Sequence, residues 1–127
     1  MIEEYFRSLE ALIAQTRIVI AETVTYDKRS TTIGFIRGEL FFLDGSRLHL
    51  REYISVQPTV DRYTYSYHYQ APDGSLIFRY DNTPHFPNLA NFPHHKHVGD
   101  EMNVISVHAP ELQVVLAEIQ KIVLQAL

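Results

Sequence analysis

The stretch RYTYSYHYQ, residues 62–70, alternates strictly between aromatic and polar side chains. Successive side chains of a β-strand point to opposite faces, so this pattern predicts a strand with its tyrosines on one face and Thr64, Ser66 and His68 on the other. The tyrosines could stack unpaired RNA bases or fill the interface between a sheet and its helices. We favour the second interpretation because terminal helices need a surface to cover. The tyrosines concerned are Tyr63, Tyr65, Tyr67 and Tyr69.

A hairpin is predicted on the C-terminal side of this strand. Proline, aspartate and glycine in residues 71–75 are typical of a turn, and apolar residues 76–80 form the returning strand. Farther along, residues 102–107 are predicted to contain one more short strand.

A second hairpin is predicted on the N-terminal side, around Asp44-Gly45. This dipeptide accepts positive φ at both central positions of a type I′ turn, and apolar residues lie on both sides of it. The two strands that it joins cover residues 31–43 and 48–56. Gly34 and Gly38, inside the first of them, indicate a bulge or bend.

The register of that hairpin places an acidic residue on the apolar side of the sheet. A two-residue loop pairs Phe41 with Leu48 and Arg37 with Glu52. Glu52 shares its face with leucine and isoleucine side chains, so its carboxylate needs a partner, and Arg37 is the predicted one. A salt bridge at the rim of the sheet is the alternative.

Amphipathic helices are predicted at both ends of the chain. Apolar residues recur at three- and four-residue spacing over residues 2–14, and a similar stripe follows Pro110, a residue that favours the first helical position. A strand rich in β-branched residues, 18–26, follows the first helix. The expected fold is α+β, an antiparallel sheet of about five strands flanked by an N-terminal and a C-terminal helix in a two-layer sandwich.

Composition restricts the classes of function. A chain of 127 residues fits a single domain, and the absence of cysteine excludes disulfides and thiolate metal sites. A net charge of -4 argues against a protein that coats nucleic acid, so any such contact must be local. No apolar run reaches the roughly 20 residues of a membrane helix, and we expect a soluble, cytoplasmic protein.

Reactive side chains are concentrated in RYDNTPHFPNLANFPHHKH, residues 79–97. This stretch holds four of the seven histidines, and its prolines argue against a continuous helix or a central strand. We therefore expect a functional loop, because long irregular segments in small domains usually have a role.

One chemistry that these residues favour is acid–base cleavage of a phosphodiester without a metal or other cofactor. Histidine can act as the base for a 2′-hydroxyl or as the acid for the leaving oxygen, and cations stabilise the charge on the phosphoryl group. Arg79 lies two residues before Asp81, so an ion pair between them is an equal alternative to a phosphate contact. The candidate catalytic residues are Glu52, His68, Arg79, Asp81, His85, His94, His95, Lys96 and His97.

A divalent metal is the alternative. In an extended segment His95 and His97 point the same way, so both could bind one ion. His85 would be a third ligand and Glu52 or Asp81 a fourth, a set that suits zinc or manganese. A solvated polar loop without a ligand is the simplest interpretation of the same residues.

The histidine-rich stretch, preceded by DGSRLHLREYI and YSYHYQAPDGSLIF, resembles the TumE family of toxins from toxin–antitoxin systems. The resemblance covers about residues 38–98. Phe86 departs from the pattern, in which a second histidine often follows the one matched by His85. The matching positions are Asp44, Gly45, Leu48, Glu52, Tyr67, His68, Tyr69, Arg79, Tyr80, Asp81, Asn82, Pro84, His85, Pro93, His94, His95, Lys96 and His97.

This resemblance implies growth inhibition through attack on RNA and neutralisation by a helix-turn-helix antitoxin. A second copy of the chain is a further candidate partner. The architecture is similar to that of metal-independent RelE-type ribonucleases, although a shared fold does not determine function. A module that binds protein or nucleic acid without turnover is the alternative. An active site requires that Glu52, His68, Arg79 and the loop 85–97 converge in one pocket.

Overall fold

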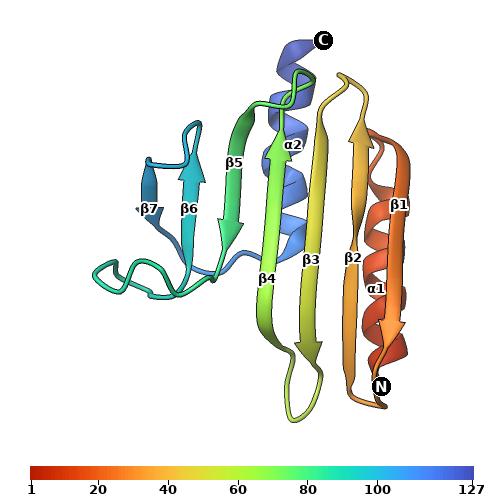
Figure 1. Ribbon diagram of the computed structural model, residues 1–127. Helices are drawn as coiled ribbons and strands as arrows, with labels where there is room; N and C mark the ends of the chain where they lie inside the picture. Colours follow the sequence, from red (N-terminus) through yellow and green to blue (C-terminus); the bar gives the residue numbers. More distant parts are fainter.

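Each strand pairs with the next one along the chain, so the sheet is an antiparallel meander in the order β1 to β7 (Figure 1). The computed structural model describes residues 1–127. The chain begins and ends with a helix, which confirms the α+β class. The elements are α1 (Ile2–Gln15), β1 (Val19–Lys28), β2 (Ile33–Phe42), β3 (Arg47–Ser55), β4 (Asp61–Gln70), β5 (Leu76–Asp81), β6 (His95–Val98), β7 (Val104–Ser106) and α2 (Leu112–Ala126).

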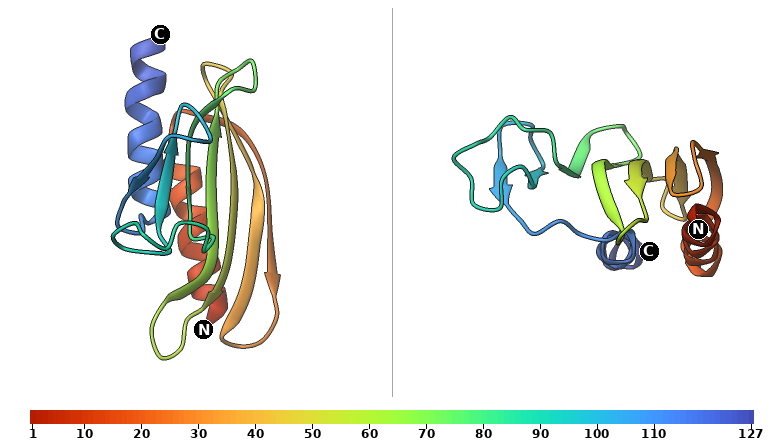
Figure 2. Two further views of the ribbon diagram at one scale, coloured as in Figure 1. Left: turned by 60° about the vertical axis from the view of Figure 1, so that its left-hand side comes forward. Right: turned by 90° about the horizontal axis from the view of Figure 1, so that it is seen from below.

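Both helices lie on the same face of the sheet and are separated from each other (Figure 2). The apolar stripe of each helix packs on the alternate, inward-pointing side chains of β2 to β5, which together form the hydrophobic core. We call the opposite side of the sheet the open face, since no helix covers it. Neither helix has the length and hydrophobicity needed to cross a bilayer.

The sheet has seven strands where the sequence predicted about five. The short strand expected in residues 102–107 is confirmed as β7. Strand β6 falls largely within residues 79–97, where the sequence predicts a loop because of its prolines and polar residues. β6 pairs with β5 on one side and β7 on the other, so tertiary pairing outweighs its low strand propensity. Helix α2 begins at Leu112 rather than at Pro110.

The predicted register of the β2–β3 hairpin is wrong by one residue. Its loop has three residues, Leu43 to Gly45, and only Gly45 has positive φ, at 87°. The Asp44 carboxylate accepts a hydrogen bond from the Ser46 amide, at 3.0 Å, which holds the turn in this form. As a result Arg37 faces Arg51 instead of Glu52.

The predicted bulge at Gly34 and Gly38 is also wrong, because both residues pair regularly with β3. The glycines allow close approach instead. A Cβ atom on Gly34 would lie 2.6 Å from the Phe6 ring, and one on Gly38 would lie 2.2 Å from the Thr23 carbonyl oxygen of β1. Packing of α1 and β1 on β2 therefore excludes larger residues.

A bulge in β4 separates Tyr63 from the other three tyrosines of residues 62–70. Tyr53 pairs with Thr64, but the next β3 residue pairs with Arg62, which leaves Tyr63 unpaired. Tyr63 is exposed and packs edge-on against Tyr53 on the open face. The other three tyrosines are buried under the helices, which confirms the interface interpretation for them.

We predict that Gly38→Ala lowers the free energy of unfolding by about 3 kcal/mol, because the added methyl group collides with backbone that cannot rotate away. Gly74→Ala is the control, since a Cβ atom there meets nothing within 4 Å although φ is 89°. Its cost should be limited to about 1 kcal/mol of backbone strain. Urea unfolding measures both values, and equal losses would contradict the close-approach argument.

Candidate active site

The strand register places most polar side chains of the open face in two rows that cross the sheet. Directly paired residues of neighbouring strands lie side by side on one face, so each row is continuous in space. The first row is Arg37, Arg51, Ser66, Asp81 and His95, and the second is Glu39, His49, His68, Arg79 and His97.

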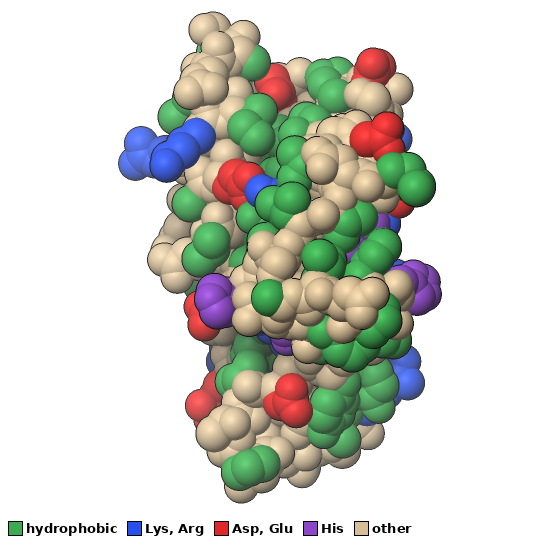
Figure 3. Space-filling model, turned by 90° about the vertical axis from the view of Figure 1, so that its left-hand side faces the viewer, with side chains coloured by type: hydrophobic (Ala, Val, Ile, Leu, Met, Phe, Trp, Pro, Cys, Tyr) green, Lys and Arg blue, Asp and Glu red, His purple; other side chains and the backbone are tan.

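The rows lead into an open pocket of about 850 Å³ beside the β5–β6 loop. Residues 83–86 of this loop form one wall of the pocket. Seen from the β7 edge, histidine surface shows only in small separate patches among hydrophobic and neutral side chains (Figure 3). Six of the nine predicted site residues line the pocket, namely His68, Arg79, Asp81, His85, His95 and His97.

The other three predicted residues do not, because strand alternation turns them to the helix side. Glu52 is buried there and accepts hydrogen bonds from the hydroxyls of Tyr5 and Tyr67, the second at 2.5 Å. Burial, and then the Glu52 carboxylate, raise the pKa of Tyr67 well above its ordinary value. Glu52 is therefore part of a core network, and the predicted pairing with Arg37 is wrong. The expected convergence is wrong for Glu52 as well, whereas His68 and Arg79 do meet residues of the loop in the pocket.

Lys96 and His94 also have contacts on the helix side. The Lys96 ammonium is 2.7 Å from Glu118 of α2 and lies over the Tyr80 ring at 4.7 Å. The His94 ring stacks on Tyr65 and its Nδ1 is 3.0 Å from the tyrosine hydroxyl. Both side chains therefore attach the β6 region to the body of the protein, and neither lines the pocket.

Asp81 is the centre of the polar cluster in the pocket. Its Oδ2 accepts a hydrogen bond from Arg79 Nε at 3.0 Å, and its Oδ1 accepts one from the Thr83 amide, also at 3.0 Å. Burial of this carboxyl opposes ionisation, but those hydrogen bonds and the nearby His95 ring outweigh burial and lower its pKa. Asp81 is therefore a buried carboxylate.

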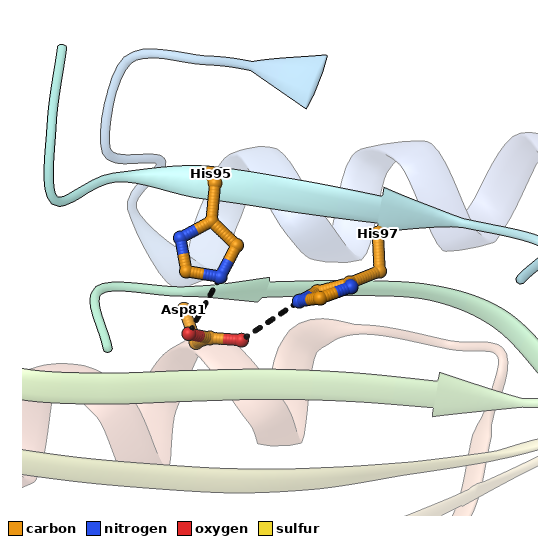
Figure 4. Close-up of side chains that lie close together, drawn as sticks. All are labelled: Asp81, His95 and His97. Atoms are coloured by element: carbon orange, nitrogen blue, oxygen red, sulfur yellow. Dashed lines mark ion pairs between the residues drawn. The ribbon is translucent and has the colours of Figure 1, made fainter. Parts of the chain in front are cut away.

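His95 and His97 point at this carboxylate from the adjacent strand (Figure 4). His95 Nε2 is 3.0 Å from Asp81 Oδ1, and His97 Nε2 is 3.7 Å from Oδ2. The Nδ1 atoms lie 2.9 Å from the carbonyl oxygens of Pro93 and Glu101, respectively. With Nδ1 engaged and Nε2 directed at Asp81, neither ring has a nitrogen free to exchange protons with a substrate.

Hydrogen bonds also fix the guanidinium of Arg79. Its two terminal nitrogens bind both oxygens of Glu101, at 2.7 and 2.8 Å, while Nε binds Asp81. The sequence left two roles open for Arg79, an ion pair with Asp81 and a phosphate contact, and the structure shows the ion pair. The Glu101 side chain, which the sequence prediction missed, lies 22 residues from Arg79 in the chain, and no local pattern connects them.

The ligand set of the predicted metal site also changes. His95 and His97 converge as expected, and the third candidate ligand is Asp81, one of the two carboxylates predicted; the candidate ligand atoms of these three residues lie within 4.8 Å of one another. His85 is not part of this group. It stands on the exposed loop, where it lines the pocket.

Two histidines of the pocket have no side-chain hydrogen bond, His68 and His85. Burial, and then the positive charge of Arg79 and the His49 ring, lower the pKa of His68. At neutral pH its imidazole is uncharged and can accept a proton. Arg51, which also lines the pocket, forms no ion pair, so it is the cation available to a ligand.

The fold and pocket define a small α+β protein with a polar site, rich in histidine and arginine, on one face of its sheet. The sequence profile of the family Toxin TumE matches residues 9–123, and the chain therefore belongs to the TumE toxin family. This membership supports a toxin role and implies a cognate antitoxin. No curated protein and no solved structure matches the chain.

We predict that the His68 ring titrates below the ordinary histidine pKa of about 6.5 and that His49→Gln raises this value, because a repulsive neighbour is removed. Because the pKa of His68 is lower in the folded state, the unfolded chain takes up this proton first as the pH falls. The contribution of His68 to folding stability is therefore complete above pH of about 6.5 and is lost as the pH falls below it. A titration followed by imidazole NMR signals measures the pKa, and no change in His49→Gln would contradict the assignment.

Proposed function

We propose that this toxin inhibits growth by cleaving RNA in the open-face pocket. The observation that carries this proposal is the direct pairing of Arg37 with Arg51 across β2 and β3. Like charges placed opposite each other destabilise a sheet, and neither guanidinium has a carboxylate partner. A phosphate backbone would neutralise both cations.

The position of this pair also suits a strand of nucleic acid. Arg51 lines the pocket and a neighbouring shallow hollow, whereas Arg37 lines only the hollow. A chain of phosphates that crosses the two arginines would be guided into the pocket. This local concentration of cations is compatible with a net charge of -4, because only the open face needs to be attractive.

The two unbonded histidines supply the proton transfers in this proposal. His68, uncharged at neutral pH, takes the proton from a ribose 2′-hydroxyl as that oxygen attacks the adjacent phosphorus. His85 acts as the acid and gives a proton to the 5′-oxygen as its bond to phosphorus breaks. The products are a 2′,3′-cyclic phosphate and a free 5′-hydroxyl, and Arg51 stabilises the charge on the phosphoryl oxygens. DNA lacks the 2′-hydroxyl and would not be cut.

The partner in this proposal is a helix-turn-helix antitoxin that acts in the cytoplasm by covering the open face. An acidic segment of such a partner would satisfy the same arginines that RNA uses, which makes neutralisation competitive with substrate. Formation of a homodimer stays a prediction from the sequence.

We predict that Arg51→Ala weakens RNA binding about tenfold and lowers the slope of log affinity against log salt by about 1, because one phosphate contact is lost. Arg7→Ala, on the exposed side of α1, is the matched control and should bind like the wild type. Filter binding of labelled single-stranded RNA at several salt concentrations gives both quantities. Identical slopes for all three proteins would contradict the proposed RNA path.

We predict that His68→Gln lowers the rate of RNA cleavage about 100-fold or more and relieves growth arrest, while circular dichroism shows an unchanged fold. His108→Gln, at an exposed position before α2, is the control and should remain toxic. Purified protein at substoichiometric concentration is incubated with labelled RNA. Cleavage by His68→Gln at the wild-type rate would refute the proposed base, and inhibition of translation only at stoichiometric ratios would identify a binding module instead.

A further inference from the structure

The proposed acid–base mechanism gives no role to three residues that lie together in the pocket, Asp81, His95 and His97. All three residues are buried, at 5%, 2% and 4% exposure, and they lie on the paired strands β5 and β6. We propose that these three residues bind one divalent transition-metal ion in the pocket. The inference concerns the pocket to which RNA cleavage is assigned, but it does not require RNA.

The hydrogen bonds of the two rings fix the atoms that would bind the ion. A carbonyl oxygen can only accept, so the Nδ1 atoms of His95 and His97 must carry hydrogen to bond Pro93 and Glu101. In the neutral ring the Nε2 atom then carries a lone pair, and both lone pairs are directed at the Asp81 carboxylate. A histidine that donates its second N–H to a carbonyl is the usual arrangement around a protein-bound metal.

The spacing of these atoms fits a small cation. Bonds of about 2.0–2.2 Å at tetrahedral angles place neighbouring ligand atoms about 3.4 Å apart. His95 Nε2 lies 3.0 Å from Asp81 Oδ1 and His97 Nε2 lies 3.7 Å from Oδ2, so each imidazole has a carboxylate oxygen near that separation, and one ligand atom from each residue lies within 4.8 Å of the others.

The surroundings would orient the ligands and leave room for a substrate. Thr83 and Arg79 hold the Asp81 carboxylate, and Glu101 offsets the charge of Arg79. The Phe86 ring packs edge-on against His95, with ring centroids 4.8 Å apart, and shields that side of the cluster. Three protein ligands leave at least one coordination position for water or a phosphoryl oxygen.

The ligand types select the class of ion. Two imidazoles and one carboxylate suit Zn²⁺ and other first-row divalent ions, whereas Mg²⁺ and Ca²⁺ prefer oxygen ligands alone. Zn²⁺ is therefore the first probe. The positive charge that it would add would lie in the pocket that His68 and Arg51 also line.

The test is a titration of the full chain, produced in a cell-free system and freed of metal with EDTA, with ZnCl₂ and separately with MgCl₂. We expect one equivalent of Zn²⁺ to bind and, at 100-fold excess over its dissociation constant, to raise the Tm by about 5–10 °C. X-ray absorption of the zinc complex should show imidazole ligands at about 2.0–2.1 Å. Absence of zinc binding, or binding without imidazole, would overturn the proposal.

Two variants locate the site. His97→Gln keeps the side-chain volume similar and should weaken zinc binding on the order of 100-fold, while His94→Gln, on the helix side, should bind like the wild type. Equal affinities of the two variants would overturn the assignment. The absorption spectrum of the wild type decides the matter if His97→Gln fails to fold. Zinc binding without RNA cleavage would refute the proposed function alone, and cleavage by a protein that binds no zinc would refute this inference alone.

Discussion

The antiparallel pairing of β5 with β6 is the constraint on which the site depends. It places Asp81 opposite His95 and Arg79 opposite His97, so four polar side chains from two short strands share one patch of the open face. A shift of one residue would send both histidines to the helix side, because side chains alternate along a strand. Contacts of the neighbouring residue Lys96 with Glu118 and Tyr80 oppose such a shift.

The sheet separates two polar systems that have different roles. On the helix side Glu52 is enclosed by tyrosine hydroxyls, and no buried side-chain polar atom of the chain lacks a hydrogen-bond partner. This network satisfies a charge within the core. On the open face Arg37 and Arg51 are left without carboxylates, which costs stability unless a ligand compensates.

Hydrogen bonding also divides the histidines of the pocket by function. The Nδ1 atoms of His95 and His97 are bonded to backbone carbonyl oxygens and their Nε2 atoms face Asp81, which suits ligation of a fixed centre better than exchange of protons. His68 has no such bonds, and its lowered pKa keeps it neutral. The sequence favoured a metal-free mechanism that drew on all these residues alike. In our two proposals the chemistries fall on different side chains of one pocket, so a metal ion and acid–base groups could act together.

The sequence by itself determined the two helices, the hairpins around the tyrosine stretch and the family, since these depend on local periodicity, turn residues and a continuous motif. It also located six of the residues that line the pocket, because the histidines are concentrated in one segment. Only the tertiary structure decided which of them meet. The three-residue turn at Gly45 set the register that separates Arg37 from Glu52, and the bulge at Tyr63 broke the alternation of β4. Strand β6 and the Arg79–Glu101 pair arise from contacts between distant segments, for which no local pattern exists.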